Sequence, residues 1–383
     1  MDAKSRAAPL LRPSRPTIYL DLWVWIRLAK AAQGGPIHPG DLVALEALRA
    51  ASRVGVAFPL SATHYEELHA ITDPRQRLDV ARTMAEISYM RTLRSPSVLV
   101  RHQLKCAMHQ HLGRPAFRPK GPEVLGIGVQ WAFVGEQGRL TLRGDDELVA
   151  QMEKLLPISL TELNQWAEFR VLAGPRDEDV PGLRVRGYDP ESVQEKFKSR
   201  ISYEMDLATQ IARGAVKRSE LRVVVQAREL SHEHLPQLSE LFAEYNLTID
   251  GAFGTDPRRA KRNRKALSEF VDSVPSIRVA VDLKHHYFRN AQKPWSSNAV
   301  RDIDALGAAL PYCDVVVADK EMGSLLSRSK VADDLGMTVV TTLPALLDLL
   351  PPLVERANEL GGDRTGWGNS AGFRLDTPPG FQF

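Results

Sequence analysis

The sequence is poor in cysteine: among 383 residues there are only two, Cys106 and Cys313. Two cysteines cannot build a disulfide framework, and they do not have the spacing of a zinc site. We expect each to be a small buried apolar side chain. Such sparing use of cysteine fits a reducing cytosol.

Long apolar runs and nucleotide-binding loops are also missing. No stretch approaches the roughly 18 to 20 apolar residues that cross a bilayer, and the first residues lack the apolar centre of a signal peptide. We therefore expect a cytoplasmic protein with no membrane partner. There is no Walker A motif and no Gly-x-Ser-x-Gly elbow, and Gly126-Ile127-Gly128 lacks the third glycine of a dinucleotide-binding loop.

Strong net charge is absent as well. A formal charge of +3 is close to neutral for this length, so the overall charge does not indicate a nucleic-acid partner. One local run does: within residues 257–265 a dense group of cations predicts a nucleic-acid contact. A solvated helix face explains the same run equally well. Its members are Arg258, Arg259, Lys261, Arg262, Arg264 and Lys265.

The chain has 43% hydrophobic and 25% charged residues, as expected for a globular protein with a sizeable core. Segments 17–98 and 273–360 alternate strand and helix patterns, whereas 99–272 shows mostly helical apolar spacing. The predicted fold is therefore α/β, a central parallel sheet with helices on both faces, split by a mostly helical insertion. Residues 1–16 and 361–383 are expected to form a disordered and a flexible tail, respectively.

Within this plan, three local predictions bear on the fold. A second strand of the first half is expected at 54–59, followed by a helix that Ser61 caps. Residues 124–143 read as strand-like segments around a turn, and 221–225 as either a short strand or part of a helix.

Two of the predicted strands end in an acid. The run Val315 to Val317 leads to Asp319, and the run Thr17 to Leu20 leads to Asp21. In open parallel sheets, ligands bind beyond the carboxyl ends of the strands. Acids that lie almost three hundred residues apart can therefore meet at one edge of the sheet.

Further acids are predicted at the same edge. Glu66 and Glu67 lie in the first turns of a helix that follows a strand, and Asp302 and Asp304 lie at the start of another helix. Clustered carboxylates repel one another unless a cation is bound or their pKa values rise. Carboxylate oxygens are the ligands that Mg²⁺ and Mn²⁺ prefer. The pattern predicts a divalent-metal site.

At these residues the chain resembles the PIN-like nuclease superfamily, whose members place Asp, Glu, Asp and Asp around a central parallel sheet. The matching pieces are 18–22, 59–67, 301–306 and 311–319. The resemblance implies that Asp21 is the first acid, Glu67 the second with Glu66 beside it, Asp302 or Asp304 the third, and Asp319 the fourth. Two positions depart from the family pattern: Trp23 replaces its usual Asn or Ser, and Val317 its usual Thr or Ser.

The resemblance implies Mg²⁺- or Mn²⁺-dependent hydrolysis of phosphodiesters through these acids. It favours an endoribonuclease, with RNA preferred over DNA, that serves in a bacterial stress response such as a toxin–antitoxin system or in phage defence. Two alternatives stay open: a DNA-acting flap-type nuclease, and a catalytically degenerate scaffold that binds RNA or protein. The apolar helix faces of the insertion also suggest a protein partner or a homodimer.

Overall fold

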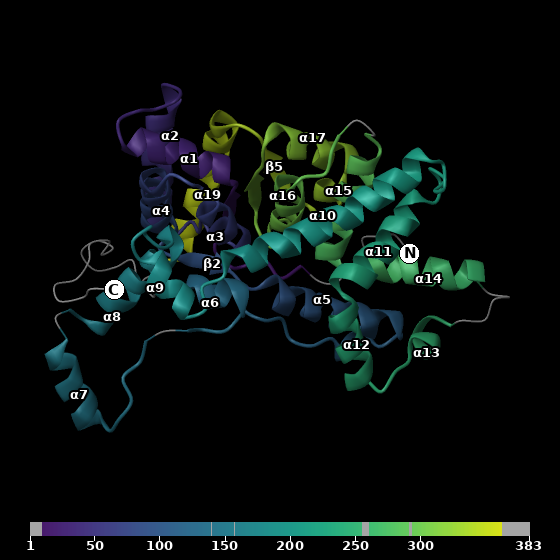
Figure 1. Cartoon of the computed structure of the whole chain (residues 1–383), viewed down its shortest axis with the longest axis horizontal. Coiled ribbons are helices and arrows are strands. Elements are labelled where there is room, and N and C mark those ends of the chain that lie inside the picture. Colours follow the sequence, from purple (N-terminus) through teal and green to yellow (C-terminus); the bar gives the residue numbers. More distant parts are fainter. Residues whose placement is uncertain (1–9, 139, 157, 255–259, 291–292, 362–383) are drawn as a thin grey trace.

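A small parallel sheet lies inside a mostly helical chain. The computed structural model describes residues 10–361 except 139, 157, 255–259 and 291–292 (Figure 1). The sheet has the order β1 (Ile18–Leu20), β4 (Val315–Val317), β5 (Thr338–Val340), and both pairings are parallel. The predicted parallel sheet with helices is therefore present, but over the described residues the chain is mostly helical and this sheet has only three short strands.

Residues 54–59 do not form the predicted strand. They run beside β1, where the Ile18 N–H donates to the Ala57 carbonyl at 2.8 Å, but only isolated bridges result. Pro59 has no N–H to donate, which interrupts a ladder at this point. A bridge from Leu60 to Thr92 then leads to an antiparallel pair of β2 (Arg91–Leu93) and β3 (Leu125–Ile127).

Alternating side chains of the strands divide the core into two. Ile18, Leu20 and Val317 belong to one apolar cluster, and Tyr19 and Val316 belong to the other. The helices that contribute to the first cluster include α1 (Leu22–Ala32), α2 (Gly40–Arg53), α3 (Ala62–His69), α4 (Pro74–Ser88) and α19 (Leu343–Glu359). Those that contribute to the second include α15 (Pro275–Phe288), α16 (Ser297–Ala309), α17 (Lys320–Ser329) and α18 (Val331–Leu335). Both faces of the sheet are therefore covered by helices.

In the described part of the segment between β2 and α15, the regular elements other than β3 are helices, and they pack on both sides of the sheet. Here α8 packs on α3 and α4, whereas α10 packs on α16 and α11 on α15 (Figure 1). Its helices are α5 (Pro96–His111), the short 3₁₀ helix η2 (Pro115–Phe117), α6 (Gly128–Phe133), α7 (Asp146–Leu155), α8 (Leu160–Ala173), α9 (Val180–Val185), α10 (Pro190–Ala212), α11 (Leu221–Glu233), α12 (Leu235–Glu244), α13 (Ile249–Phe253) and α14 (Ala260–Asp272).

The structure decides two local predictions within this segment, those for residues 124–143 and 221–225. Of the strand-like pattern at 124–143, β3 is the only strand among the described residues, because Gly128 turns the chain at a φ of +86° into α6. Residues 221–225 are helical and begin α11.

Part of the predicted amino-terminal tail packs on the body. Leu10 and Leu11 contact the second apolar cluster, and Arg12 donates to the Leu335 carbonyl at 2.8 Å. Of the predicted carboxyl-terminal tail, residues 362–383 lie outside the described residues. Cys106 and Cys313 are both buried and unpaired, as expected. Over the described residues, no helix has the length and apolar character needed to cross a membrane.

Candidate active site

The ends of β1 and β4 place two carboxylates side by side. Asp21 follows β1 at the N-cap position of α1, and Asp319 follows β4 and caps α17 with its side chain. The Asp21 N–H donates to the Val317 carbonyl at 3.1 Å, which joins the two strand ends. One carboxylate oxygen of Asp319 accepts from the Met322 N–H at 2.6 Å. Parallel pairing of β1 and β4 thus brings together acids from the two ends of the chain.

Two helices add further carboxylates to this edge. Glu67 on α3 and Asp302 on α16 join Asp21 around a small cavity of about 10 Å³. That volume is close to the space of a single water molecule. The remaining lining is mostly apolar: Tyr19, Ala305, Leu306, Val317, Ala318 and Met322.

Burial and mutual repulsion raise the pKa values of these acids. Burial, followed by the charges of Asp21 and Asp302, raises the pKa of Glu67 to about 8. Burial and the charges of Asp21 and Asp319 raise that of Asp302 to about 7. Burial and the charge of Asp319 raise the pKa of Asp21 to about 6, although backbone N–H groups of Leu22 and Asp319 oppose the rise. At neutral pH the cluster therefore retains protons that a cation can displace.

The alternative candidates of the two acid pairs, Glu66 and Asp304, do not line this cavity. Asp304 forms a two-pronged ion pair with Arg200 on α10, at 2.6 and 2.8 Å. Arg200 also donates to Glu233 on α11 at 2.9 Å. Glu66 faces this group: burial, followed by the Asp304 charge, raises its pKa. The structure therefore places Glu67 and Asp302 at the cavity, and Glu66 and Asp304 at an ion-pair network beside it.

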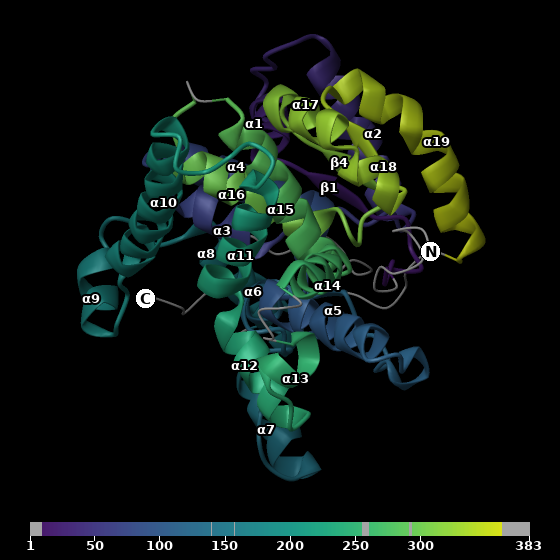
Figure 2. The ribbon, with the colours of Figure 1, turned by 90° about the vertical axis from the view of Figure 1, so that its right-hand side faces the viewer.

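The described part of the basic run does not adjoin the carboxylates. Arg258 and Arg259 lie outside the described residues, and Lys261 and Arg262 lie in α14. Further along this helix, Arg264 and Lys265 are exposed. In Figures 1 and 2, α14 lies below α1 and α17, whose first turns follow Asp21 and Asp319.

Two cations near the cavity were missed by the sequence-based prediction. Lys293, which pairs with Glu321, and Arg301 both lower the pKa of Asp302 and so favour its charged form. Arg301 also lies over the Phe197 ring, 4.4 Å from its centroid. Arg301 could have been suspected because it precedes Asp302, but Lys293 lies between helices without a recognisable pattern.

A buried histidine fixes the position of the β1 end. His64 Nε2 lies 2.8 Å from the Leu20 carbonyl, and its Nδ1 accepts from the Ser61 N–H at 3.0 Å. Ser61 is the N-cap residue of α3, as predicted. Burial lowers the pKa of His64 to about 4, so the ring is neutral and donates through Nε2. This link holds α3, and with it Glu67, against the residue that precedes Asp21.

The donor set fits a hard divalent cation in chemistry and in size. Three carboxylates line a cavity with space for about one small ion. In their present positions, however, no three His, Cys, Asp or Glu side chains of the described segments form a group that could hold a metal ion. The oxygen ligands therefore need side-chain rotation before they bind one ion together.

Comparison with family models of proteins, with curated proteins and with solved structures gave no match for this chain. The functional assignment therefore rests on the residues and their geometry.

The raised pKa values predict how metal-free stability depends on pH. A folded-state pKa above the unfolded value means that the native state binds more protons, so stability is full below about pH 4 and declines as pH rises towards 8. We expect Glu67→Gln to flatten this decline and to raise the melting temperature at pH 8 in EDTA by a few degrees. Thermal unfolding at pH 5 and pH 8 measures it. The control is Asp348→Asn, which removes an exposed carboxylate on α19; equal declines in wild type and Glu67→Gln would contradict the prediction.

Proposed function

We propose that the protein is a Mg²⁺- or Mn²⁺-dependent nuclease of the PIN-like type, acting as an endoribonuclease. The observation that carries the proposal is the convergence of Asp21, Glu67, Asp302 and Asp319, from two strand ends and two helices, with raised pKa values on three of them. Burying like charges together is costly. A site of this kind is typical of proteins that use the carboxylates to bind a cation and, through it, a phosphate.

Each acid has a distinct part in this proposal. Asp21 interacts electrostatically with Glu67, Asp302 and Asp319, so its carboxylate is placed to be shared between two ligand groups. Glu67 and Asp302, which line the cavity, would form one ligand group with Asp21. Asp319 would form the other ligand group with Asp21. A bound ion supplies charge neutralisation of the phosphate and a water of lowered pKa.

A non-catalytic scaffold is the second candidate, and two observations favour it. Val317 is fully buried and Trp23 is partly buried at positions where the resembled family has hydroxyl or amide side chains. Polar partners that orient metal ligands are worth about 10- to 100-fold in metal affinity or activity. A scaffold would bind RNA or protein without metal-dependent cleavage.

Cleavage of labelled oligonucleotides tests the proposal. We expect single-stranded RNA to be cut in Mn²⁺ or Mg²⁺ and not in EDTA, and the cutting to be lost in Asp21→Asn and in Asp319→Asn. Single-stranded DNA and a flapped DNA duplex form the other substrate arms, because faster cutting of the flap would favour a flap-type nuclease. No cleavage of any substrate by the wild type, together with no Mn²⁺ binding in calorimetry, would leave the scaffold.

A further inference from the structure

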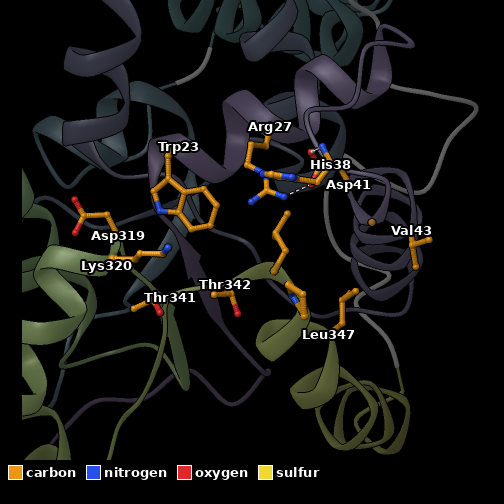
Figure 3. A pocket seen from close by; sticks show the side chains of 13 residues that line it. Trp23, Arg27, His38, Asp41, Val43, Asp319, Lys320, Thr341, Thr342 and Leu347 are labelled. Carbon is orange, nitrogen blue, oxygen red and sulfur yellow. Dashed lines mark hydrogen bonds and ion pairs between the residues drawn. The ribbon is translucent and has the colours of Figure 1, made fainter.

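An open groove adjoins the carboxylate cluster on the side of α1 and α19. Its volume is about 710 Å³, within the range of small-ligand sites. Asp319 forms part of its wall, so the groove and the cluster share this side chain. Figure 3 shows Trp23 and Arg27 along one side and Lys320, Thr341 and Thr342 along the other. A ligand held at the carboxylates would therefore extend directly into this groove.

The α1 side of the groove is a wall formed by Trp23 and Arg27, and Asp41 holds Arg27 in place. Arg27 lies over the Trp23 ring, with its guanidinium carbon 5.6 Å from the ring centroid. Asp41, fully buried on α2, accepts a hydrogen bond from Arg27, and its second oxygen accepts from the His38 N–H at 2.9 Å. Indole rings and guanidinium planes are the surfaces on which nucleobases stack.

Two donors on this wall lack an acceptor. Both the Trp23 Nε1–H and the Arg27 Nε–H are shielded from solvent, and neither has a hydrogen-bond partner among the described residues. An unpaired buried donor is costly. Because neither atom is exposed to the groove, a ligand reaches these donors only if the side chains move.

The opposite side supplies a cation. Lys320 is exposed at the first turn of α17, and no ion pair or hydrogen bond of its side chain is found in the part of the chain that the structure covers. Figure 3 shows its side chain extending into the groove below Trp23. An ammonium group in this position complements a phosphate of a nucleic-acid backbone.

We propose that this groove binds one unpaired nucleotide next to the scissile phosphate, with its base on the Trp23–Arg27 wall and its backbone phosphate at Lys320, so that the substrate must be single-stranded. The inference rests on the proposed nuclease function and deepens it. A base held in a duplex has both faces stacked and cannot lie against Trp23 without leaving the helix. The groove therefore selects unpaired over paired nucleic acid.

Binding without cleavage tests the groove separately from the chemistry. The full chain in Ca²⁺ or EDTA is titrated into a fluorescein-labelled 12-nucleotide RNA, the same sequence as DNA, and the RNA in a duplex, with anisotropy as readout. We expect the single strands to bind at least about tenfold tighter than the duplex. Trp23→Ala should weaken single-strand binding about 10- to 100-fold, and Trp23→Phe less than about threefold, because a phenyl ring still stacks.

Charge variants test the phosphate contact. Lys320→Gln should weaken binding at low salt and lower the slope of log affinity against log salt by about one. Its matched control is Lys30→Gln, an exposed lysine at the end of α1 that does not line this groove. Equal effects of the two substitutions would overturn the assignment of Lys320.

The outcomes separate this inference from the function on which it rests. If the wild type cuts RNA and Trp23→Ala has an unchanged KM and an unchanged preference over duplex, the groove assignment is overturned and the nuclease stands. If the wild type binds single strands through Trp23 but does not cut them, the groove stands and the nuclease fails. If neither single strand binds under any condition, the groove assignment is overturned irrespective of cleavage.

Discussion

Asp302→Asn should reduce metal-dependent cleavage at least about 100-fold, whereas Asp304→Asn should leave the rate within about threefold of the wild type. Asp302 lines the cavity with Asp21 and Glu67, whereas Asp304 is held by Arg200. Even groups that only orient a metal ligand cost about 10- to 100-fold when removed, so a ligand itself should cost more. Initial rates on one RNA oligonucleotide at saturating Mn²⁺ measure both variants.

The two variants are well matched because they make the same change two residues apart on α16. The Arg200–Asp304 pair is partly exposed, with 35% of the Asp304 side chain accessible, so its loss should cost no more than about 1 kcal/mol of stability. Melting curves of both variants check that they fold. If Asp304→Asn were the inactive variant, the register of α16 at the site would be wrong. The same comparison applies to α3, where Glu67→Gln should be inactive and Glu66→Gln active.

The strand-end acids could be predicted from the sequence because their signal is local. A run of β-branched residues that ends in an aspartate predicts both the strand and the position of the acid, and parallel pairing brings Asp21 and Asp319 together. The helical acids could not be chosen in this way. Residues two apart on a helix point in directions that differ by about 200°, so only one of Asp302 and Asp304 can face the cavity. The sequence pattern around them suits either residue. Arg200, about a hundred residues earlier, holds Asp304 away from the cavity, and no local signal identifies that partner.

Other features depend on parts of the chain that no local pattern connects. The sheet proved smaller than expected because the segment before Pro59 makes bridges rather than a strand. The Trp23 groove joins α1 to residues that follow β4 and β5, so the sequence identified Trp23 only as a departure from a family pattern. The helical insertion likewise packs on both halves of the α/β body through side chains far apart in the sequence.

Lys284→Met should destabilise the fold by about 3–5 kcal/mol at pH 8. Lys284 on α15 is only 3% exposed, and its ammonium group lies 2.7 Å from Glu204 on α10 and 2.7 Å from Glu229 on α11. Burial alone would lower the pKa of Lys284, but the two carboxylates raise it above its usual value. Removing the cation leaves two buried carboxylates close together and unpaired, which is the costly way to break a buried ion pair. Urea denaturation followed by circular dichroism gives the difference.

The loss of stability should come from the two unpaired carboxylates rather than from the missing lysine side chain. Adding Glu204→Gln and Glu229→Gln to Lys284→Met should therefore recover most of the stability, because neutral amides tolerate burial better than unpaired charges do. Lys198→Met is the matched control: this exposed α10 lysine pairs with Glu195 at the surface, and its loss should cost under about 0.5 kcal/mol. A Lys284→Met loss as small as that of the control would mean that water reaches Glu204 and Glu229. The helix α11 would then be held to α15 by apolar contacts and the Arg222–Asp282 ion pair, and α10, which carries Arg200, would be held by its packing on α16.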